Sequence, residues 1–121
     1  MKVTIKKSKT KVLLTVKCKD MKNPKQQRSQ FDQTLASNSW MLQENKKSDV
    51  HEDGTVTTVS IWGRTFGHRK SENEIEKMTG NLLKRAARYA DIDIYQSDFQ
   101  YEKVPEDAEA FKLAAVLFSD D

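Results

Sequence analysis

The chain of 121 residues is long enough for one domain with a hydrophobic core and too short for two ordinary domains. Its residues are 36% hydrophobic and 32% charged, and no apolar run approaches the roughly 20 residues that cross a bilayer. The single cysteine, Cys18, excludes an internal disulfide. The first residues lack the apolar stretch of a secretory signal, so we expect a single cytoplasmic domain that spans residues 1–121 and has no membrane association.

The charge is distributed unevenly along the chain. Residues 1–28 carry nine lysines and Arg28 against one acid, Asp20, which gives a net charge of +9, whereas residues 29–121 carry −6. Concentrated positive charge favours a polyanionic partner, because neutralised phosphates release condensed counterions. The composition therefore indicates either a nucleic acid, DNA or RNA, or an acidic protein surface.

The first predicted elements are two strands that form a lysine-rich hairpin over residues 2–19. Val3 and Ile5 alternate with polar residues, residues 12–18 do so on a second segment, and residues 8–10 are expected to form the turn. Side chains of a strand alternate between two faces, so the hairpin lysines should share one exposed face. This predicted basic face consists of Lys2, Lys6, Lys11, Lys17 and Lys19. The alternative interpretation is that the lysines protect a sheet edge from aggregation.

A helix and two strands are expected next. Pro24 suits the first turn of a helix over residues 25–37. Residues 39–45 and 55–66 then have strand patterns, and the Asp53-Gly54 pair before the second of them favours a turn. The second strand has apolar residues on both of its faces. We therefore expect other parts of the protein to cover both faces of this strand in part.

The clearest predicted helix covers residues 71–90. Ser71 and Glu74 match a capping box. Gly80 costs about 1 kcal/mol relative to alanine inside a helix, so either close packing or a local bend is expected there. The residues predicted to form the inward stripe of this helix are Ile75, Met78, Leu82, Ala86 and Tyr89.

A strand over residues 91–104 and a final helix from Pro105 through Phe118 complete the predicted elements. A phase slip at residues 96–98 of the strand predicts a bulge or a tight turn. The order β-β-α-β-β-α-β-α predicts an α+β domain, with a mainly antiparallel sheet and helices packed on it. An unpaired edge strand of such a sheet can pair with a second copy of the chain, which would form a homodimer.

Two further basic groups are candidate phosphate contacts. One is a stripe on the helix over residues 71–90, comprising Lys77, Asn81, Lys84, Arg85 and Arg88. The same bases also complement the helix dipole, which is the alternative interpretation. The other group lies in the loop before that helix and comprises Arg64, His68, Arg69 and Lys70. A helix amino terminus can hold a phosphate, but the capping box is expected to occupy its amides.

Few residues indicate catalysis. The two histidines and Cys18 do not match zinc-site spacing, and the glycines do not form a phosphate-binding loop, so we expect no cofactor and no metal. Asp91 and Asp93, with Asp98 or Glu102, offer a weak magnesium site and hence a weak possibility of a nuclease. The strand aromatics Trp62, Phe66, Tyr95, Phe99 and Tyr101 provide either base-stacking surfaces or core.

The sequence thus favours a small non-enzymatic nucleic-acid-binding protein that contacts phosphates largely without regard to sequence. The alternative is a protein-protein interaction module, such as a small inhibitor or adaptor of the kind that mobile elements encode. Exposure of Trp40, Trp62 or the 111–118 segment would favour this alternative, because aromatic anchors dominate many protein interfaces.

Overall fold

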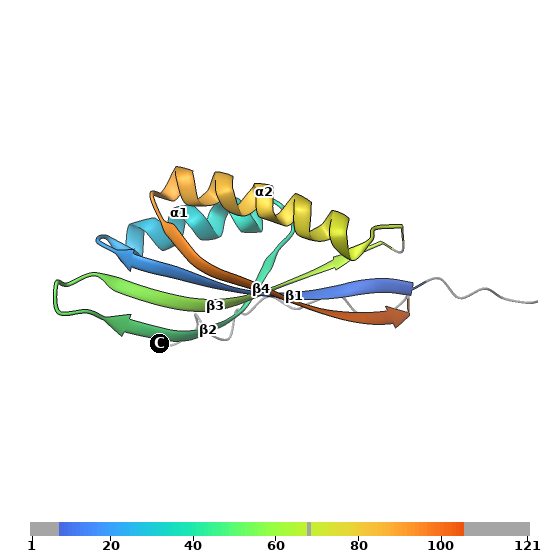
Figure 1. The fold of residues 1–121 in the computed structure, drawn as a ribbon, viewed down its shortest axis with the longest axis horizontal. Helices are drawn as coiled ribbons and strands as arrows, with labels where there is room; N and C mark the ends of the chain where they lie inside the picture. The colour runs from blue at the N-terminus through green and yellow to red at the C-terminus, as the bar shows by residue number, and fades with distance from the viewer. Residues whose placement is uncertain (1–7, 68, 106–121) are drawn as a thin grey trace, which may run out of the picture.

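The computed structural model describes residues 8–67 and 69–105. Its elements are β1 (Ser8–Met21), α1 (Pro24–Ala36), β2 (Met41–Val50), β3 (Val56–Phe66), α2 (Glu72–Ala90) and β4 (Asp93–Pro105). The strands form one antiparallel sheet in the order β2-β3-β1-β4. Both helices lie on the same face of this sheet, and the other face is free of helices in the described part of the chain (Figure 1). The predicted α+β class with an antiparallel sheet is confirmed.

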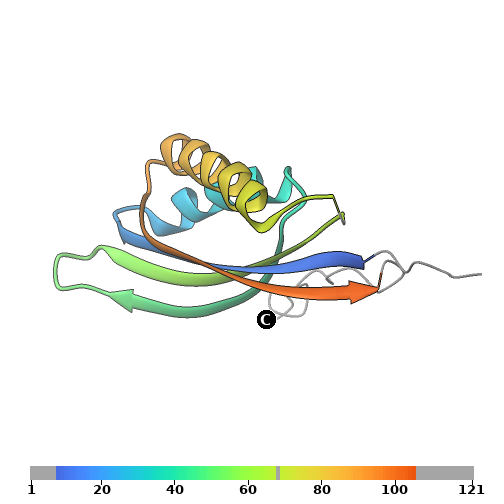
Figure 2. The ribbon, with the colours of Figure 1, turned by 45° about the vertical axis from the view of Figure 1, so that its right-hand side comes forward.

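The order of the elements produces two interleaved crossovers. β1 and β2, joined by α1, flank β3, and β3 and β4, joined by α2, flank β1. This is the split βαβ, or ferredoxin-like, arrangement. It places β1 and β3 at the centre of the sheet and leaves β2 and β4 as its edges (Figure 2).

The predicted turn at residues 8–10 is wrong. Ser8, Lys9 and Thr10 belong to β1 and pair with Pro105, Val104 and Lys103 of β4. The expected strand over residues 2–6 and the expected helix after Pro105 both lie outside the described residues. The polar triplet looked like a turn because its partner strand is more than 90 residues away in sequence, so no local signal marks the pairing.

The alternation predicted for β1 builds the core. Val12, Leu14, Val16 and Cys18 are fully buried against the helices. From the helices, Phe31 and Leu35 of α1 and Ile75 of α2 pack on this surface, and Trp62 of β3 contacts Phe31 edge to face with ring centroids 6.4 Å apart. Burial of such side chains supplies the main driving force for folding.

The β2–β3 hairpin is longer than the sequence suggested. The predicted strand ended at residue 45, whereas β2 continues through the polar residues 46–50, which pair with residues 56–59 of β3. Gly54 has φ +88° in the connecting turn, as its pairing with Asp53 predicted. In β4 the register shifts at Tyr95, next to the predicted slip at residues 96–98.

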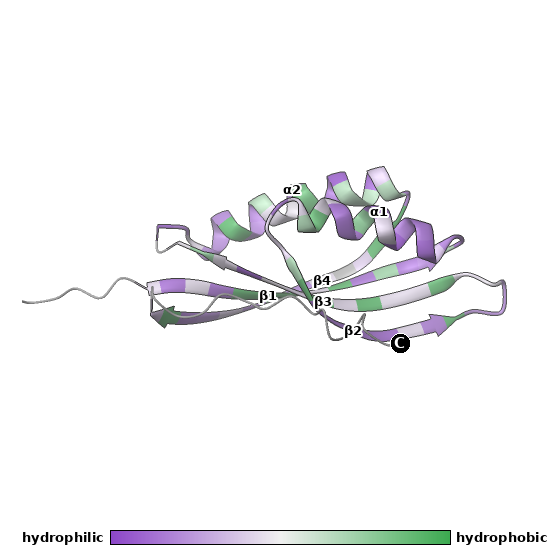
Figure 3. Ribbon diagram, turned by 180° about the vertical axis from the view of Figure 1, so that it is seen from behind, coloured by the Kyte–Doolittle hydropathy of each residue, from purple (hydrophilic) through white to green (hydrophobic). Residues whose placement is uncertain are grey.

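The predicted capping box of α2 is confirmed, but its predicted inward stripe is partly wrong. The Glu74 amide donates to Ser71 Oγ at 3.2 Å, and the Ser71 amide donates to Glu74 Oε1 at 3.3 Å. Met78 and Tyr89 are 40% and 63% exposed, and the buried positions instead include Thr79, Leu83 and Ala90. Hydrophilic and hydrophobic residues alternate along the α2 ribbon (Figure 3).

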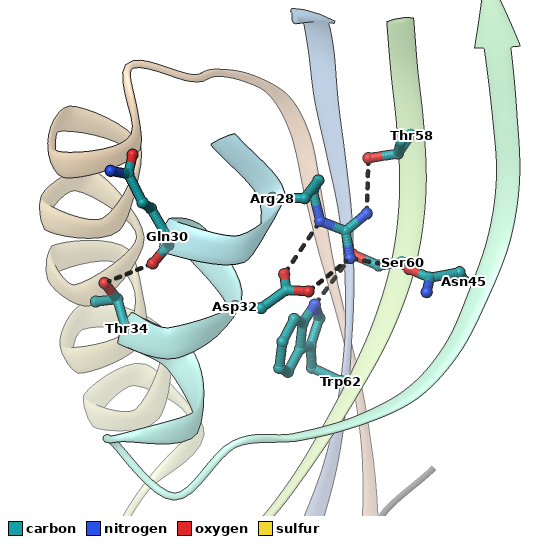
Figure 4. A network of polar contacts seen from close by, with 8 residues as sticks. All are labelled: Arg28, Gln30, Asp32, Thr34, Asn45, Thr58, Ser60 and Trp62. Atoms are coloured by element: carbon teal, nitrogen blue, oxygen red, sulfur yellow. Dashed lines mark hydrogen bonds and ion pairs between the residues drawn. The ribbon is translucent and has the colours of Figure 1, made fainter. Parts of the chain in front are cut away.

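A polar network fastens α1 to the sheet. The Arg28 guanidinium donates to Asp32 Oδ1 at 3.0 Å and to Asn45 Oδ1 and Thr58 Oγ1 at 2.9 Å each (Figure 4). The Arg28 side chain is largely buried, and burial raises the pKa of the Asp32 carboxyl although Arg28 opposes this effect. Such a paired charge is costly to disrupt, so we assign these residues a structural role.

Candidate functional site

The described lysines predicted for the basic face lie on one side of β1. Lys11, Lys17 and Lys19 alternate with the buried residues of β1 and therefore point away from the helices. Acids of β4 occupy part of the same surface: Glu102 is opposite Lys11 and Asp93 is opposite Lys19. The open face therefore has mixed charge rather than uniform positive charge. Lys2 and Lys6 lie outside the described residues.

Tyr95 stands between two of these lysines. Its side chain is 62% exposed, and it is the extra residue where the register between β1 and β4 shifts. The Nζ atoms of Lys17 and Lys19 each lie 5.2 Å from the centroid of its ring. This distance is within the range of cation–π attraction. The result is an aromatic surface with two ammonium groups beside it.

Two hollows lie around the end of the sheet, next to this aromatic surface. The first, of about 580 Å³, is lined by Lys19 and Lys22 together with Asp20, Asp91 and Asp93. The second, of about 710 Å³, is lined by Lys22, Lys25 and Tyr89. We call the set Lys17, Lys19, Lys22 and Lys25, with Tyr95 and Tyr89 at its two ends, the lysine track.

The amino end of α1 adds to the positive potential of the track. Its first turn contains no acidic residue, and the side chain of the capping residue Asn23 makes no capping hydrogen bond. The helix dipole places partial positive charge at this end. The Gln27 side chain links the same end to the carboxyl end of α2, because it donates to the carbonyl of Asp91, the capping residue of that helix.

The remaining predicted bases lie elsewhere. Arg64 is in β3 rather than in a loop, and its Nη1 donates to the Asn38 carbonyl at 2.9 Å. Arg69 and Lys70 are exposed before α2, where Lys70 lies 4.0 Å from Glu74 Oε2, and the capping box occupies the nearby amides as expected. The exposed stripe on α2 comprises Lys77, Lys84, Arg85 and Arg88. Both helices lie on one face of the sheet (Figures 1 and 2), so α2 and its exposed bases are on the other side of the sheet from Lys11 and Lys17.

Sequence reasoning missed Lys22, Lys25 and Tyr89 as members of the track. Lys22 and Lys25 flank Pro24, so the predicted helix start could have placed them beside the end of the preceding strand. Tyr89 was assigned to the core of α2, whereas it is exposed. Of the strand aromatics, Trp62 and Phe66 are buried and only Tyr95 is exposed.

The candidate catalytic groups of the sequence are placed as follows in the described residues. These residues contain no group of three metal-ligating side chains, and Asp91 caps the carboxyl end of α2 with φ +55°, so it does not share a strand face with Asp93. His51 Nε2 lies 2.7 Å from Thr57 Oγ1 and 3.3 Å from Asp20 Oδ1. A catalytic triad uses both ring nitrogens, whereas here one nitrogen makes both contacts.

Comparison with known proteins gives little further information. No protein-family model matches the chain, and no curated protein matches its sequence. The solution structure of the C-terminal domain of the MgtC protein from Mycobacterium tuberculosis is similar, with a TM-score of 0.40 and 12% identity over 89% of this chain and 100% of that domain. Similarity at this level carries no functional information. None of the helices in the described ranges is both long and apolar enough to span a bilayer.

Proposed function

We propose that this protein is a non-enzymatic nucleic-acid-binding protein that holds single-stranded nucleic acid along the lysine track. The observation that carries the proposal is the exposed Tyr95 ring with the Lys17 and Lys19 ammonium groups 5.2 Å from its centroid. Proteins that bind single strands without sequence preference combine such stacking surfaces with cationic contacts to the backbone. A second exposed ring, Tyr89, at the far end of the track provides another stacking surface.

The centre of the open sheet face fits this role less well. The residues of β1 and β3 on that face include Leu13, Thr15, Ile61 and Gly63, none of which is aromatic. Sheet-based RNA-binding domains stack bases on aromatic residues of their central strands. The proposal therefore assigns binding to the end of the sheet, where β1, α1 and β4 meet.

Single strands suit the track better than duplexes. The major groove of a duplex admits a projecting helix or two-stranded ribbon, whereas the track is a strand end beside two hollows. Stacking on Tyr95 or Tyr89 also requires an unpaired base. Asp20, Asp91 and Asp93 line the first hollow, so the backbone should follow the lysine side of the track and avoid these carboxylates.

The test is fluorescence anisotropy with a labelled single-stranded oligonucleotide, compared with the same sequence as a duplex. Tyr95→Ala should weaken binding of the single strand by about 1–3 kcal/mol, the contribution of one stacked base. Tyr95→Phe keeps the ring and should bind like the parent protein. A Lys84→Gln, Arg88→Gln double variant changes the exposed face of α2 and is the control for general loss of positive charge.

Two outcomes would contradict the proposal. One is that the parent protein binds neither DNA nor RNA single strands. The other is that Tyr95→Ala retains full affinity while the α2 double variant loses it.

A protein-protein interaction module remains the second candidate, supported by the exposed face of α2. Met78 and Tyr89 are exposed there beside Lys84 and Arg85, a combination that suits an acidic protein partner. Exposure of Trp40 or Trp62 would have favoured this candidate, but each is 1% exposed. The 111–118 segment lies outside the described residues. A pull-down with and without nuclease separates the candidates, because recovery of one protein after nuclease treatment supports this one.

A further inference from the structure

A small hollow on the helix side of the sheet is separate from the lysine track. Its volume is about 70 Å³, and it is lined by Asn38, Trp40, Arg64, Met78, Thr79, Leu82 and Arg85. These residues come from the α1–β2 connection, from β3 and from α2. A single water needs roughly 10–15 Å³ of such space, so the hollow has room for several waters or one small oxyanion.

The tryptophan that lines the hollow has an unused hydrogen-bond donor. The Trp40 side chain is 1% exposed, and its Nε1 is buried without a partner in the described part of the protein. Trp62 shows the contrasting case, because its Nε1 donates to Ser60 Oγ at 3.0 Å. Buried donors are nearly always paired, so an isolated one calls for an acceptor that the described residues do not supply.

Two guanidinium groups line the same hollow, and neither has an acidic partner among the described residues. Arg64 uses Nη1 for the Asn38 carbonyl and lies 4.4 Å over the Phe66 ring, which leaves most of its five N–H donors for other acceptors. Burial lowers the pKa of Arg64, and no carboxylate in the described ranges offsets this effect. Arg85 is exposed, and the ion pairs between described residues involve neither arginine.

We propose that this hollow binds one phosphate group, held by the Arg64 and Arg85 guanidiniums beside the Trp40 indole. Two positive charges match a phosphate dianion, and planar guanidiniums suit the bidentate recognition of its oxygens. Met78 and Leu82 form apolar walls, which lower the local dielectric and strengthen electrostatic attraction inside the hollow. Free phosphate and a phosphoryl group on a larger molecule share this chemistry.

The experiment follows the two indole N–H resonances of the ¹⁵N-labelled protein during a titration with sodium phosphate at constant ionic strength. The Trp40 resonance, identified by its loss in Trp40→Phe, should shift and saturate, whereas the Trp62 resonance should stay in place. Arg85→Gln and Arg64→Gln should each weaken phosphate binding by about tenfold or more, because each removes a charge-assisted hydrogen bond. Arg88→Gln, one turn away on α2 and outside the hollow, should bind phosphate normally.

An unchanged Trp62 resonance shows that each variant is folded. Because Arg85 is exposed, we expect Arg85→Gln to disturb folding less than Arg64→Gln. The proposal is overturned if phosphate leaves the Trp40 resonance in place, if acetate binds as tightly as phosphate, or if both arginine variants retain full affinity. Parallel titrations with phosphoserine distinguish the sources. Tighter binding of phosphoserine assigns the site to a phosphoryl group on a larger molecule, and weaker binding assigns it to free phosphate.

Discussion

Cys18 lies near the carboxyl end of the central strand β1, close to Arg28 and Asp32 of α1, and is fully buried. Burial raises the pKa of its thiol from 9.0 to about 11, partly opposed by the positive charge of Arg28 and increased by the negative charge of Asp32. The thiol is therefore protonated at neutral pH. It serves as a small apolar residue and not as a nucleophile, in line with the inward position predicted from the alternation of β1.

The Cys18 pKa makes the stability of the protein fall at alkaline pH. The folded pKa is raised, so the contribution is fully present below pH 9 and is lost as pH rises toward 11, because the unfolded chain releases this proton first. One proton corresponds to about 1.4 kcal/mol per pH unit, so the expected loss in the free energy of unfolding at pH 10 is about 1.4 kcal/mol. Urea unfolding at several pH values measures it.

Cys18→Ala is the control for this effect. The variant loses packing at every pH, but the difference in stability between it and the parent should shrink between pH 8 and 10, since tyrosine and lysine ionisation is common to both proteins. A difference that stays constant over this range would show that Cys18 ionises alike in the folded and unfolded states.

For single residues, the sequence predicted the position of a site residue only where the alternation of side chains along a regular strand determines it. It placed Lys11, Lys17 and Lys19 on one face because β1 is regular. It did not place Tyr95 beside Lys17 and Lys19, since this contact depends on the register shift between β1 and β4. The position of Arg64 on the helix side likewise depends on its pairing with Val12, a residue far away in sequence.

Among the elements, α2 contains one residue, Gly80, whose replacement should stabilise the protein. Gly80 lies inside the helix, and a Cβ built at this position meets no atom within 4 Å, so close packing does not explain the glycine. Alanine has less conformational freedom to lose on folding. Gly80→Ala should therefore raise the free energy of unfolding by about 0.5–1 kcal/mol, as measured by urea unfolding.

Gly54→Ala is the matched control. Gly54 also has open space around it, but its φ is +88°, a conformation that side chains disfavour. This variant should lose about 1–2 kcal/mol. Equal effects of the two substitutions would show that backbone conformation does not decide the outcome.

The elements themselves were predictable where a local signal marks them. Pro24 marked the start of α1, Ser71 and Glu74 marked α2, and the Asp53-Gly54 pair marked the turn between β2 and β3. The errors lie where pairing is non-local. The amino end of β1 was assigned to a turn, and the strand predicted for β2 ended at residue 45, because both segments are polar and their strand character comes from their neighbours in the sheet.

For the molecule as a whole, the layered fold determines which of the unevenly distributed basic residues lie on the same side of the protein. The helices cover one face of the sheet and the other face is open, so the exposed bases of α2 do not form one continuous patch with Lys11 and Lys17 (Figure 2). On the open face, acids of β4 oppose some lysines of β1. The +9 of residues 1–28 is thus partly neutralised by the fold, and only some of the lysines should release counterions on binding.

The salt dependence of nucleic-acid binding measures how many lysines release counterions when the nucleic acid binds. Lys17 and Lys11 lie on the same strand and face, but Lys17 is opposite Gln96 in the register and Lys11 is opposite Glu102. Each phosphate neutralised on a single strand contributes about 0.7 to the slope of log affinity against log salt. Lys17→Gln should therefore reduce the slope by about 0.7, whereas Lys11→Gln should leave it nearly unchanged because Glu102 already offsets that charge. Anisotropy titrations over a salt series give both slopes. Equal reductions in the two variants would mean that the acids of β4 do not restrict binding, and that the whole open face takes part.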